Sequence, residues 1–134
     1  MIYAVIDTNV LVSAMLAKHS DSSTVVVLNH VLSRDIQLLY NDDIIAEYRE
    51  VLSRKAFSFD SNKVNKLINS LRLLGQDTMR THFPQSMLDE KDRVFYEIAL
   101  TKEDSYLVTG NLKHFPKTPQ VVTPAAMLKI LEQD

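Results

Sequence analysis

The chain of 134 residues has no cysteine, only two glycines and no long apolar run. Without cysteine it has no disulfide framework, no thiolate nucleophile and no metal site with thiolate ligands. Two glycines are too few for a glycine-rich phosphate loop, which excludes nucleotide sites of the Walker and Rossmann types. No apolar stretch approaches the roughly 20 residues that span a bilayer, and Asp7 interrupts the first apolar run before it resembles a secretory signal. We therefore expect a cytoplasmic protein with no membrane partner.

The chain also lacks an excess of charge of one sign. It has 15 Lys and Arg residues and 17 Asp and Glu residues, a net charge of −2. This balance argues against binding of nucleic acid through a broad positive field. Hydrophobic residues make up 46% and charged residues 24% of the chain, as in ordinary globular proteins. Composition and length together predict a single domain over residues 1–134.

Short apolar runs alternate with segments of helical periodicity along the chain. This pattern predicts strands over residues 2–6, 36–40, 78–83, 106–109 and 121–122. It predicts helices over residues 9–17, 22–33, 42–52, 61–74, 89–101 and 124–132. Strands separated by helices indicate a parallel sheet with helices on both faces. In such sheets, ligands bind outside the carboxyl ends of the strands.

Two polar residues follow predicted strands and therefore belong to that edge. Asp7 directly follows the first strand, and Asn111 has the equivalent place after strand 106–109, in the sequence Thr109-Gly110-Asn111. Each also has an ordinary structural interpretation. Asp7 would cap the next helix, and Thr-Gly-Asn would form a turn.

Glu47 and Asp92 are constrained by the geometry of their predicted helices. Each projects roughly 90° from the centre of the apolar stripe of its helix. An acid at the margin of a buried face can point into a cleft while the core holds its backbone in place. The structural alternative is a solvated boundary position for both, or a favourable interaction of Asp92 with the helix N-terminus.

Asp7, Glu47 and Asp92 could converge on one cleft at the carboxyl edge of the sheet. Carboxylates that lie so close together repel one another and raise each other's pKa. A divalent cation removes this repulsion, and an all-oxygen ligand set favours Mg²⁺ or Mn²⁺. Such ions suit phosphodiester hydrolysis, because they activate water and neutralise charge on the leaving oxygen.

Five segments of the chain carry a family resemblance. They are VIDTNVLVSAML at 5–16, IIAEYREVLSR at 44–54, DEKDRVFYEIAL at 89–100, YLVTGNLKHFP at 106–116 and VVTPAAML at 121–128. In this order they resemble the PIN-domain ribonucleases, of the group that forms the toxin component of bacterial and archaeal toxin–antitoxin pairs.

The resemblance implies an α/β fold, specifically a three-layer α/β/α sandwich around a central five-stranded parallel sheet. It implies an endoribonuclease that uses Mg²⁺ or Mn²⁺, with Asp7, Glu47, Asp92 and Asn111 as its catalytic set. Asp7 and Asp92 would bind the metal directly, and Glu47 would bind metal or orient the attacking water. Asn111 stands where many members have an acid and could hold a metal-bound water through its amide. The implied partners are RNA, a cognate antitoxin protein and, as often in the family, a second copy of the chain.

Other side chains have supporting roles in this hypothesis. Those that could position the acids are Thr8, Asn9, Asp89 and Thr109, although Asp89 is more simply a helix cap. Those that could bind RNA are Arg49, Arg54, Lys63, Lys66 and Lys113, for which a solvated surface is the ordinary interpretation. Lys113 and His114 follow the proposed site in a segment that we interpret as a solvated loop. Tyr48, Phe57 and Phe59 lie near the basic segment in sequence and could stack on bases.

Two other functions compete with this one. Asn111 is compatible with a non-catalytic RNA-binding or scaffold protein of the same fold, whereas the three acids argue against it. A phosphoaspartyl protein with Asp7 as nucleophile is less favoured, because Asn9 stands where such phosphatases have a second acid. Under the leading hypothesis, one bound divalent ion brings the net charge from −2 to about zero. RNA binding should then depend on the metal and a local basic rim.

Overall fold

The computed structural model of the protein describes residues 1–133. Its strands are β1 (Ile2–Ile6), β2 (Ile36–Tyr40), β3 (Gln76–Asp77), β4 (Ser105–Val108) and β5 (Val121–Val122). Its α-helices are α1 (Thr8–Leu16), α2 (Ser23–Leu32), α3 (Asp42–Leu52), α4 (Ser61–Leu74), α5 (Arg93–Ala99) and α6 (Pro124–Gln133). Three 3₁₀ turns complete the set: η1 (Lys55–Phe57), η2 (Glu90–Asp92) and η3 (Leu112–His114). No helix among these residues is both long and apolar enough to cross a membrane.

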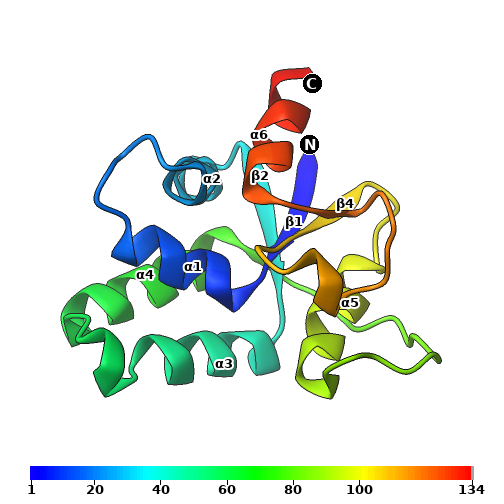
Figure 1. Cartoon of the computed structure of the whole chain (residues 1–134), viewed down its shortest axis with the longest axis horizontal. Helices are drawn as coiled ribbons and strands as arrows, with labels where there is room; N and C mark the ends of the chain where they lie inside the picture. The colour runs from blue at the N-terminus through cyan, green and yellow to red at the C-terminus, as the bar shows by residue number, and fades with distance from the viewer. Residues whose placement is uncertain (134) are drawn as a thin grey trace.

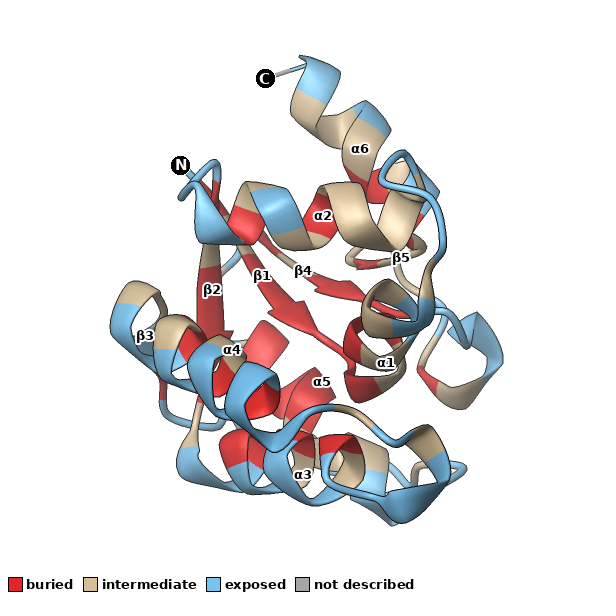
Figure 2. Cartoon of the chain, turned by 90° about the vertical axis from the view of Figure 1, so that its left-hand side faces the viewer, coloured by how far each residue is buried: buried red, intermediate tan, exposed pale blue. Residues whose placement is uncertain are grey.

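The five strands form one parallel sheet in the order β3-β2-β1-β4-β5. In register, Tyr3 of β1 lies opposite Gln37 of β2 on one side and Ser105 of β4 on the other. Helices α2 and α6 lie on one side of the strands, and α3 and α5 lie on the other (Figures 1 and 2). The predicted three-layer α/β/α fold is confirmed.

The core lies along β1, β2 and β4 and the helices that cover them. Ala4, Val5 and Ile6 of β1 are buried, because a central parallel strand is covered on both faces. The burial colouring in Figure 2 shows the same concentration on the strands and on α5 beneath them. The continuous apolar run at the start of the sequence is the local signature of this central position.

Side chains fix the starts of several helices where the sequence predicts them. Asn41 accepts a hydrogen bond from the Ile44 N–H at 2.9 Å and so caps α3. The Thr123 hydroxyl accepts one from the Ala126 N–H at 3.1 Å, and Pro124 occupies the first position of α6. Gly75 ends α4, and a Cβ on it would lie 2.7 Å from the Leu71 carbonyl oxygen. These contacts fix the starts of α3 and α6 and the end of α4.

Two predicted elements differ from the structure. The strand predicted over residues 78–83 is wrong, because pairing with β2 ends at Asp77 and the Thr78 N–H makes the last ladder-like bond, to the Tyr40 carbonyl at 2.7 Å. Beyond it the chain turns toward α5, where the Thr81 N–H donates to the Glu97 carbonyl at 3.0 Å. The single helix predicted over residues 89–101 consists of η2 followed by α5.

Candidate active site

The sheet has its topological switch point between β1 and β4. From β1 the chain moves outward through β2 to β3, and it then crosses back to β4 and continues to β5 on the other side. The connections that leave β1 and β4 therefore diverge, which opens a crevice at the carboxyl ends of these two strands. A hollow of about 320 Å³ lies there. We call it the acidic hollow; its lining residues are Asp7, Thr8, Asn9, Val12, Val51, Phe57, Asp89, Asp92, Asn111 and His114.

Asp7 lies at the floor of this crevice, directly after β1. It has the N-cap position of α1, yet its side chain makes no capping hydrogen bond. Instead its carboxylate accepts a hydrogen bond from the Thr109 hydroxyl at 2.7 Å. Burial raises the pKa of Asp7 from 3.8 to about 6; the Thr109 hydrogen bond opposes this rise, and the charges of Asp92 and Glu47 add to it. The Asp7 carboxylate therefore does not cap α1 and instead joins the end of β1 to the turn after β4.

Glu47 reaches the neighbourhood of Asp7 from α3. Its carboxylate accepts a hydrogen bond from the Thr8 hydroxyl, although Glu47 itself does not line the acidic hollow. Burial, and after it the charge of Asp92, raise the pKa of Glu47 against the effect of the Thr8 hydrogen bond. The buried Tyr48 hydroxyl donates to the Ile6 carbonyl and so ties α3 to the end of β1. Tyr48 is therefore a core residue, and a role for it in base stacking is wrong.

Asp92 lies where η2 meets α5, and its carboxylate faces His114. The Asp92 carboxylate and His114 Nδ1 are 3.3 Å apart. Partial burial, and then the charge of Asp89, raise the pKa of Asp92, while His114 lowers it. Asp89 caps η2 by accepting a hydrogen bond from the Lys91 N–H at 3.0 Å. Asp89 thus holds the turn that presents Asp92 and also lines the acidic hollow.

The turn after β4 is bound to the start of α1. The Asn9 side chain accepts a hydrogen bond from the Gly110 N–H at 3.3 Å. The Thr109 oxygen, which donates to Asp7, accepts one from the Asn111 N–H at 3.0 Å. Asn111 itself is exposed and lines the hollow. Asn9 and Thr109 therefore connect the two strand ends through hydrogen bonds, and Thr8 connects the end of β1 to Glu47 on α3.

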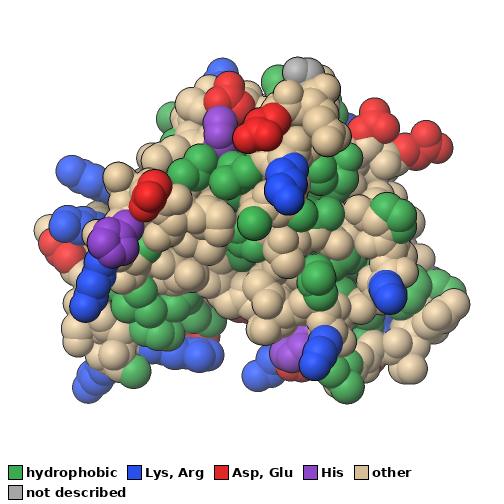
Figure 3. Space-filling model, turned by 45° about the horizontal axis from the view of Figure 1, so that its top comes forward, with side chains coloured by type: hydrophobic (Ala, Val, Ile, Leu, Met, Phe, Trp, Pro, Cys, Tyr) green, Lys and Arg blue, Asp and Glu red, His purple; other side chains and the backbone are tan. Residues whose placement is uncertain are grey.

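None of the candidate RNA-binding cations lines the acidic hollow. Arg49 donates to Asn65 at 3.0 Å, and Arg54 pairs with Glu50 at 2.9 Å. Lys63 and Lys66 are exposed on α4, and Lys113 is exposed on η3. On the face in Figure 3, Lys and Arg side chains are scattered among apolar and acidic ones and form no continuous positive field.

Several residues of the hollow were not predicted from the sequence. His114 was interpreted as part of a solvated loop; this is wrong, because it contacts Asp92 and lines the hollow. Val12 and Val51, from α1 and α3, were not predicted either, whereas Phe57, from η1, is a candidate for base stacking from the sequence and lines the hollow. The spacing of three residues from Asn111 to His114, which one 3₁₀ turn brings to the same side, was the available signal for the histidine.

The donor chemistry of the site suits a hard divalent cation. Asp7, Glu47 and Asp92 supply only oxygen, and the charges of Asp92 and Glu47 add to the raised pKa of Asp7, a repulsion that a cation relieves. Among residues 1–133, no three acidic or histidine side chains already lie at the spacing of metal ligands. The residues present therefore fit Mg²⁺ or Mn²⁺ in kind, with no ligand geometry defined.

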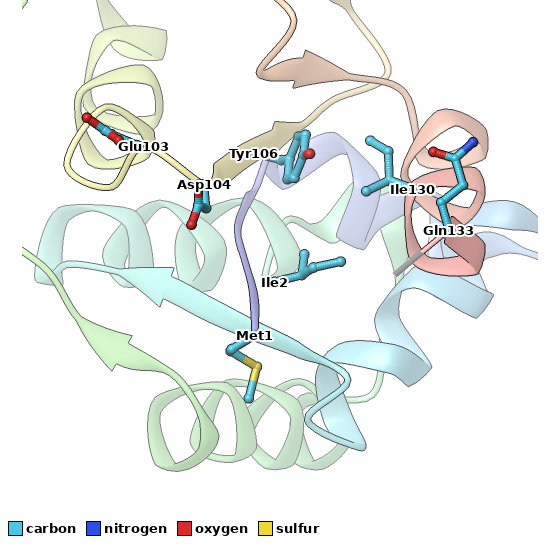
Figure 4. Close-up of a pocket in the computed structure, with 7 residues that line it drawn as sticks. All are labelled: Met1, Ile2, Glu103, Asp104, Tyr106, Ile130 and Gln133. Atoms are coloured by element: carbon cyan, nitrogen blue, oxygen red, sulfur yellow. The ribbon is translucent and has the colours of Figure 1, made fainter.

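A larger hollow, of about 430 Å³, lies at the opposite end of the strands (Figure 4). Met1 and Ile2 from the start of β1, Tyr106 from β4 and Ile130 from α6 line it. Its acids, Glu103 and Asp104, are both exposed. It contains none of the candidate catalytic residues, which distinguishes it from the acidic hollow.

The fold and this site define an α/β protein with an acidic candidate active site at the switch point of a parallel sheet. The chain matches the PIN domain family over residues 3–113 and belongs to that family. PIN domains are generally nucleases and typically use divalent metal ions. The match includes Asp7, Glu47, Asp92 and Asn111. A comparison with curated proteins finds no match.

Proposed function

We propose that this PIN-domain protein is a Mg²⁺- or Mn²⁺-dependent endoribonuclease that hydrolyses RNA phosphodiester bonds with water as the nucleophile. One observation carries the proposal. Asp7, Glu47 and Asp92 come from the end of β1, from α3 and from the start of α5, and burial raises the pKa of all three. The charges of Glu47 and Asp92 add to the rise for Asp7, which lines an open hollow together with Asp92. A structural role does not require three acids in one place whose pKa values are all raised.

Each side chain of the site has its own role in the proposed hydrolysis. Asp7 and Asp92, with Glu47, would hold the cation, which when bound neutralises phosphate charge and activates water. The Thr109 hydroxyl orients the Asp7 carboxylate, and the Thr8 hydroxyl orients that of Glu47. His114 contacts Asp92 and limits its rotation. The exposed Asn111 amide can donate a hydrogen bond to a phosphate oxygen or a water in the hollow.

Electrostatics make substrate binding depend on the cation. Without one, three carboxylates repel an RNA phosphate, and none of the candidate RNA-binding lysines and arginines lines the hollow to reverse this. With one, the centre of the hollow becomes less negative while its rim is unchanged. The proposal therefore requires weak RNA binding in a chelator and stronger binding with Mg²⁺ or Mn²⁺.

The chemistry is tested by RNA cleavage. Purified protein with Mn²⁺ or Mg²⁺ should cut a labelled single-stranded RNA, and Asp7→Asn or Asp92→Asn should lower the rate at least about a hundredfold. Asp104→Asn, at the opposite edge of the sheet, is the matched control and should cleave like the wild type. Equal rates for the wild type and both hollow variants, in EDTA as well as with metal, would disprove the proposal.

We propose further that the protein is the cytoplasmic toxin of a toxin–antitoxin pair, on the basis of the segments that resemble such toxins. Induced expression of the wild type should arrest growth, and expression of Asp7→Asn at the same level should not. Co-expression of a small protein encoded beside it should relieve the arrest. Arrest by both forms would mean that the toxicity does not come from the acidic hollow.

A further inference from the structure

Phe57 is an aromatic side chain of the acidic hollow that the hydrolytic chemistry leaves unused. It ends η1, between α3 and α4, and lines the hollow together with Asp7 and Asp92. Its ring is stacked on that of Phe59, with centroids 5.3 Å apart and planes 11° from parallel. Phe59 packs against the hydrophobic core, whereas Phe57 does not belong to the residues that form or cover it. The pair thus joins the core to the hollow.

The turn that carries Phe57 holds the ring in a defined place. The Phe57 N–H donates to the Arg54 carbonyl at 3.1 Å, and the Ser58 N–H donates to the Lys55 carbonyl at 3.1 Å. The Ser58 hydroxyl donates to the same Lys55 carbonyl at 3.2 Å. Ser58 has a φ of 53°, a left-handed conformation that is uncommon for a residue other than glycine. The backbone is therefore fixed on both sides of Phe57, which reduces the entropy lost when a ligand binds to its ring.

A flat apolar ring beside phosphate-binding chemistry matches one part of a nucleic acid, the base. Carboxylates and a bound cation are enough to recognise a phosphate, and a phenylalanine ring adds no favourable interaction with it. A base gains stacking energy from it whatever its identity, because every base has an aromatic face. The adjacent Lys55 is exposed, and no ion pair among residues 1–133 includes it, so a neighbouring phosphate can meet its ammonium group.

We propose that Phe57 is the stacking platform for an unpaired base next to the phosphate that occupies the acidic hollow. A base within a duplex is stacked on its neighbours, so the platform selects RNA that is single-stranded at this position. This inference rests on the proposed function and adds the side chain that would receive the base. It predicts little dependence on the identity of the stacked base.

The test measures binding without cleavage, in the Asp7→Asn background. Because the chain has no tryptophan, Phe57→Trp introduces a single indole, whose fluorescence a stacked base quenches. A single-stranded hexanucleotide RNA should quench it, and the same RNA annealed to its complement should not. Leu73→Trp, at an 80% exposed position of α4 outside the hollow, is the matched control and should not respond.

A second measurement uses fluorescence anisotropy of the labelled hexanucleotide, also in the Asp7→Asn background. Phe57→Ala should weaken binding at least about fivefold, and Phe57→Tyr should restore it. Removal of one base from the RNA should weaken binding to the Phe57 protein by a similar factor, at one position only, and should leave binding to Phe57→Ala unchanged. Equal affinities of the Phe57 and Ala forms, quenching by duplex, or no RNA binding by any form would overturn the proposal.

The two proposals can fail separately. Metal-dependent cleavage by the wild type, without a base-dependent effect at position 57, would support the nuclease and refute the platform. Quenching and selective loss of affinity, without cleavage under any metal, would support the platform and refute the hydrolytic function.

Discussion

Two carboxylates of this molecule, those of Asp7 and Glu97, are almost equally buried and yet have opposite environments. Asp7 is 7% exposed and Glu97 is 4% exposed. Burial, together with neighbouring acids, raises the pKa of Asp7 to about 6. Burial also acts to raise the pKa of Glu97, but a hydrogen bond from the Phe83 N–H and the charges of Arg80 and Arg93 outweigh it and lower the pKa below 4.5.

The two pKa shifts are opposite because the two carboxylates have different hydrogen-bond and ion-pair partners. Glu97 receives the Arg80 guanidinium at 2.8 Å and the Phe83 N–H at 2.9 Å, and Arg93 lies 3.7 Å away. Arg93 also donates to the Phe83 carbonyl at 2.5 Å and the Gln85 carbonyl at 2.8 Å. This cluster binds the segment after β3 to α5. Asp7 receives the Thr109 hydroxyl and lies near other acids, and no ion pair among residues 1–133 includes it, so no basic side chain neutralises its charge.

The largest expected effect is that of Asp7→Asn on stability. Since the pKa of Asp7 is higher in the folded protein than its ordinary 3.8, ionisation costs stability as pH rises from about 4, and the cost is complete above about 6. Asparagine removes the cost and can still accept the Thr109 hydrogen bond. At pH 8 the variant should be more stable by about 3 kcal/mol, with no gain below about pH 4.

Urea unfolding in EDTA at pH 4, 6 and 8 measures this gain. The exposed Asp104→Asn serves as control and should show no pH-dependent gain. A variant less stable than the wild type at pH 8 would contradict the assignment of Asp7 as an uncompensated charge.

Glu97→Gln should have a smaller effect of opposite sign. Glutamine keeps the shape and can still accept the Phe83 N–H, but it loses the ion pairs with Arg80 and Arg93. The unfolding free energy at pH 7 should fall by about 2 kcal/mol, a loss moderated by the partial exposure of both arginines. Because the pKa of Glu97 is lowered, its contribution is present above about pH 4.5 and is lost as pH falls below that value.

Hydrogen exchange separates this effect from a general loss of stability. In Glu97→Gln the amides of residues 79–88 should exchange faster before those of β1 do. Glu103→Gln, on an exposed turn, is the matched control and should leave both sets unchanged. Uniform acceleration across the sheet would show that the Glu97 cluster does not act on this segment.

Thr109→Val should have the smallest effect and acts on Asp7 directly. Valine keeps the volume of threonine but removes the donor to Asp7 and the acceptor for the Asn111 N–H. The pKa of Asp7 should rise further, and stability at pH 7 should fall by about 1 kcal/mol. Carboxyl titration by NMR measures the pKa. Thr118→Val is the control, since among residues 1–133 the buried Thr118 hydroxyl has no hydrogen-bond partner. An unchanged or lower pKa of Asp7 in Thr109→Val would contradict the prediction.

Much of the fold could be predicted because its signals are local. The apolar run at 2–6 marks a strand covered on both faces, and Asn41 and Thr123 cap the helices that follow them. The segment 78–83 could not be predicted in this way. Its path depends on hydrogen bonds to Glu97, which is more than ten residues further along the chain.

The same distinction between local signals and contacts distant in sequence applies to the residues of the candidate site. Asp7, Glu47 and Asp92 could be selected because strand ends and helix margins constrain where they point. His114 and Phe57 carry no such local mark, and each reaches the hollow through a short 3₁₀ turn. Tyr48 shows the reverse case: an aromatic beside Glu47 in sequence is a buried core residue.

The sequence by itself determined the alternation of strands and helices, the absence of thiolate and glycine-loop chemistry, and the acids at the ends of elements. These properties depend on residue type and on spacings of a few positions. Only the tertiary structure decided which charges are neutralised and which are not. Charge neutralisation depends on distance in space and not on distance along the chain. The strand order β3-β2-β1-β4-β5 brings Thr109 to Asp7 across 102 positions. The path of the chain after β3 brings Arg80 to Glu97.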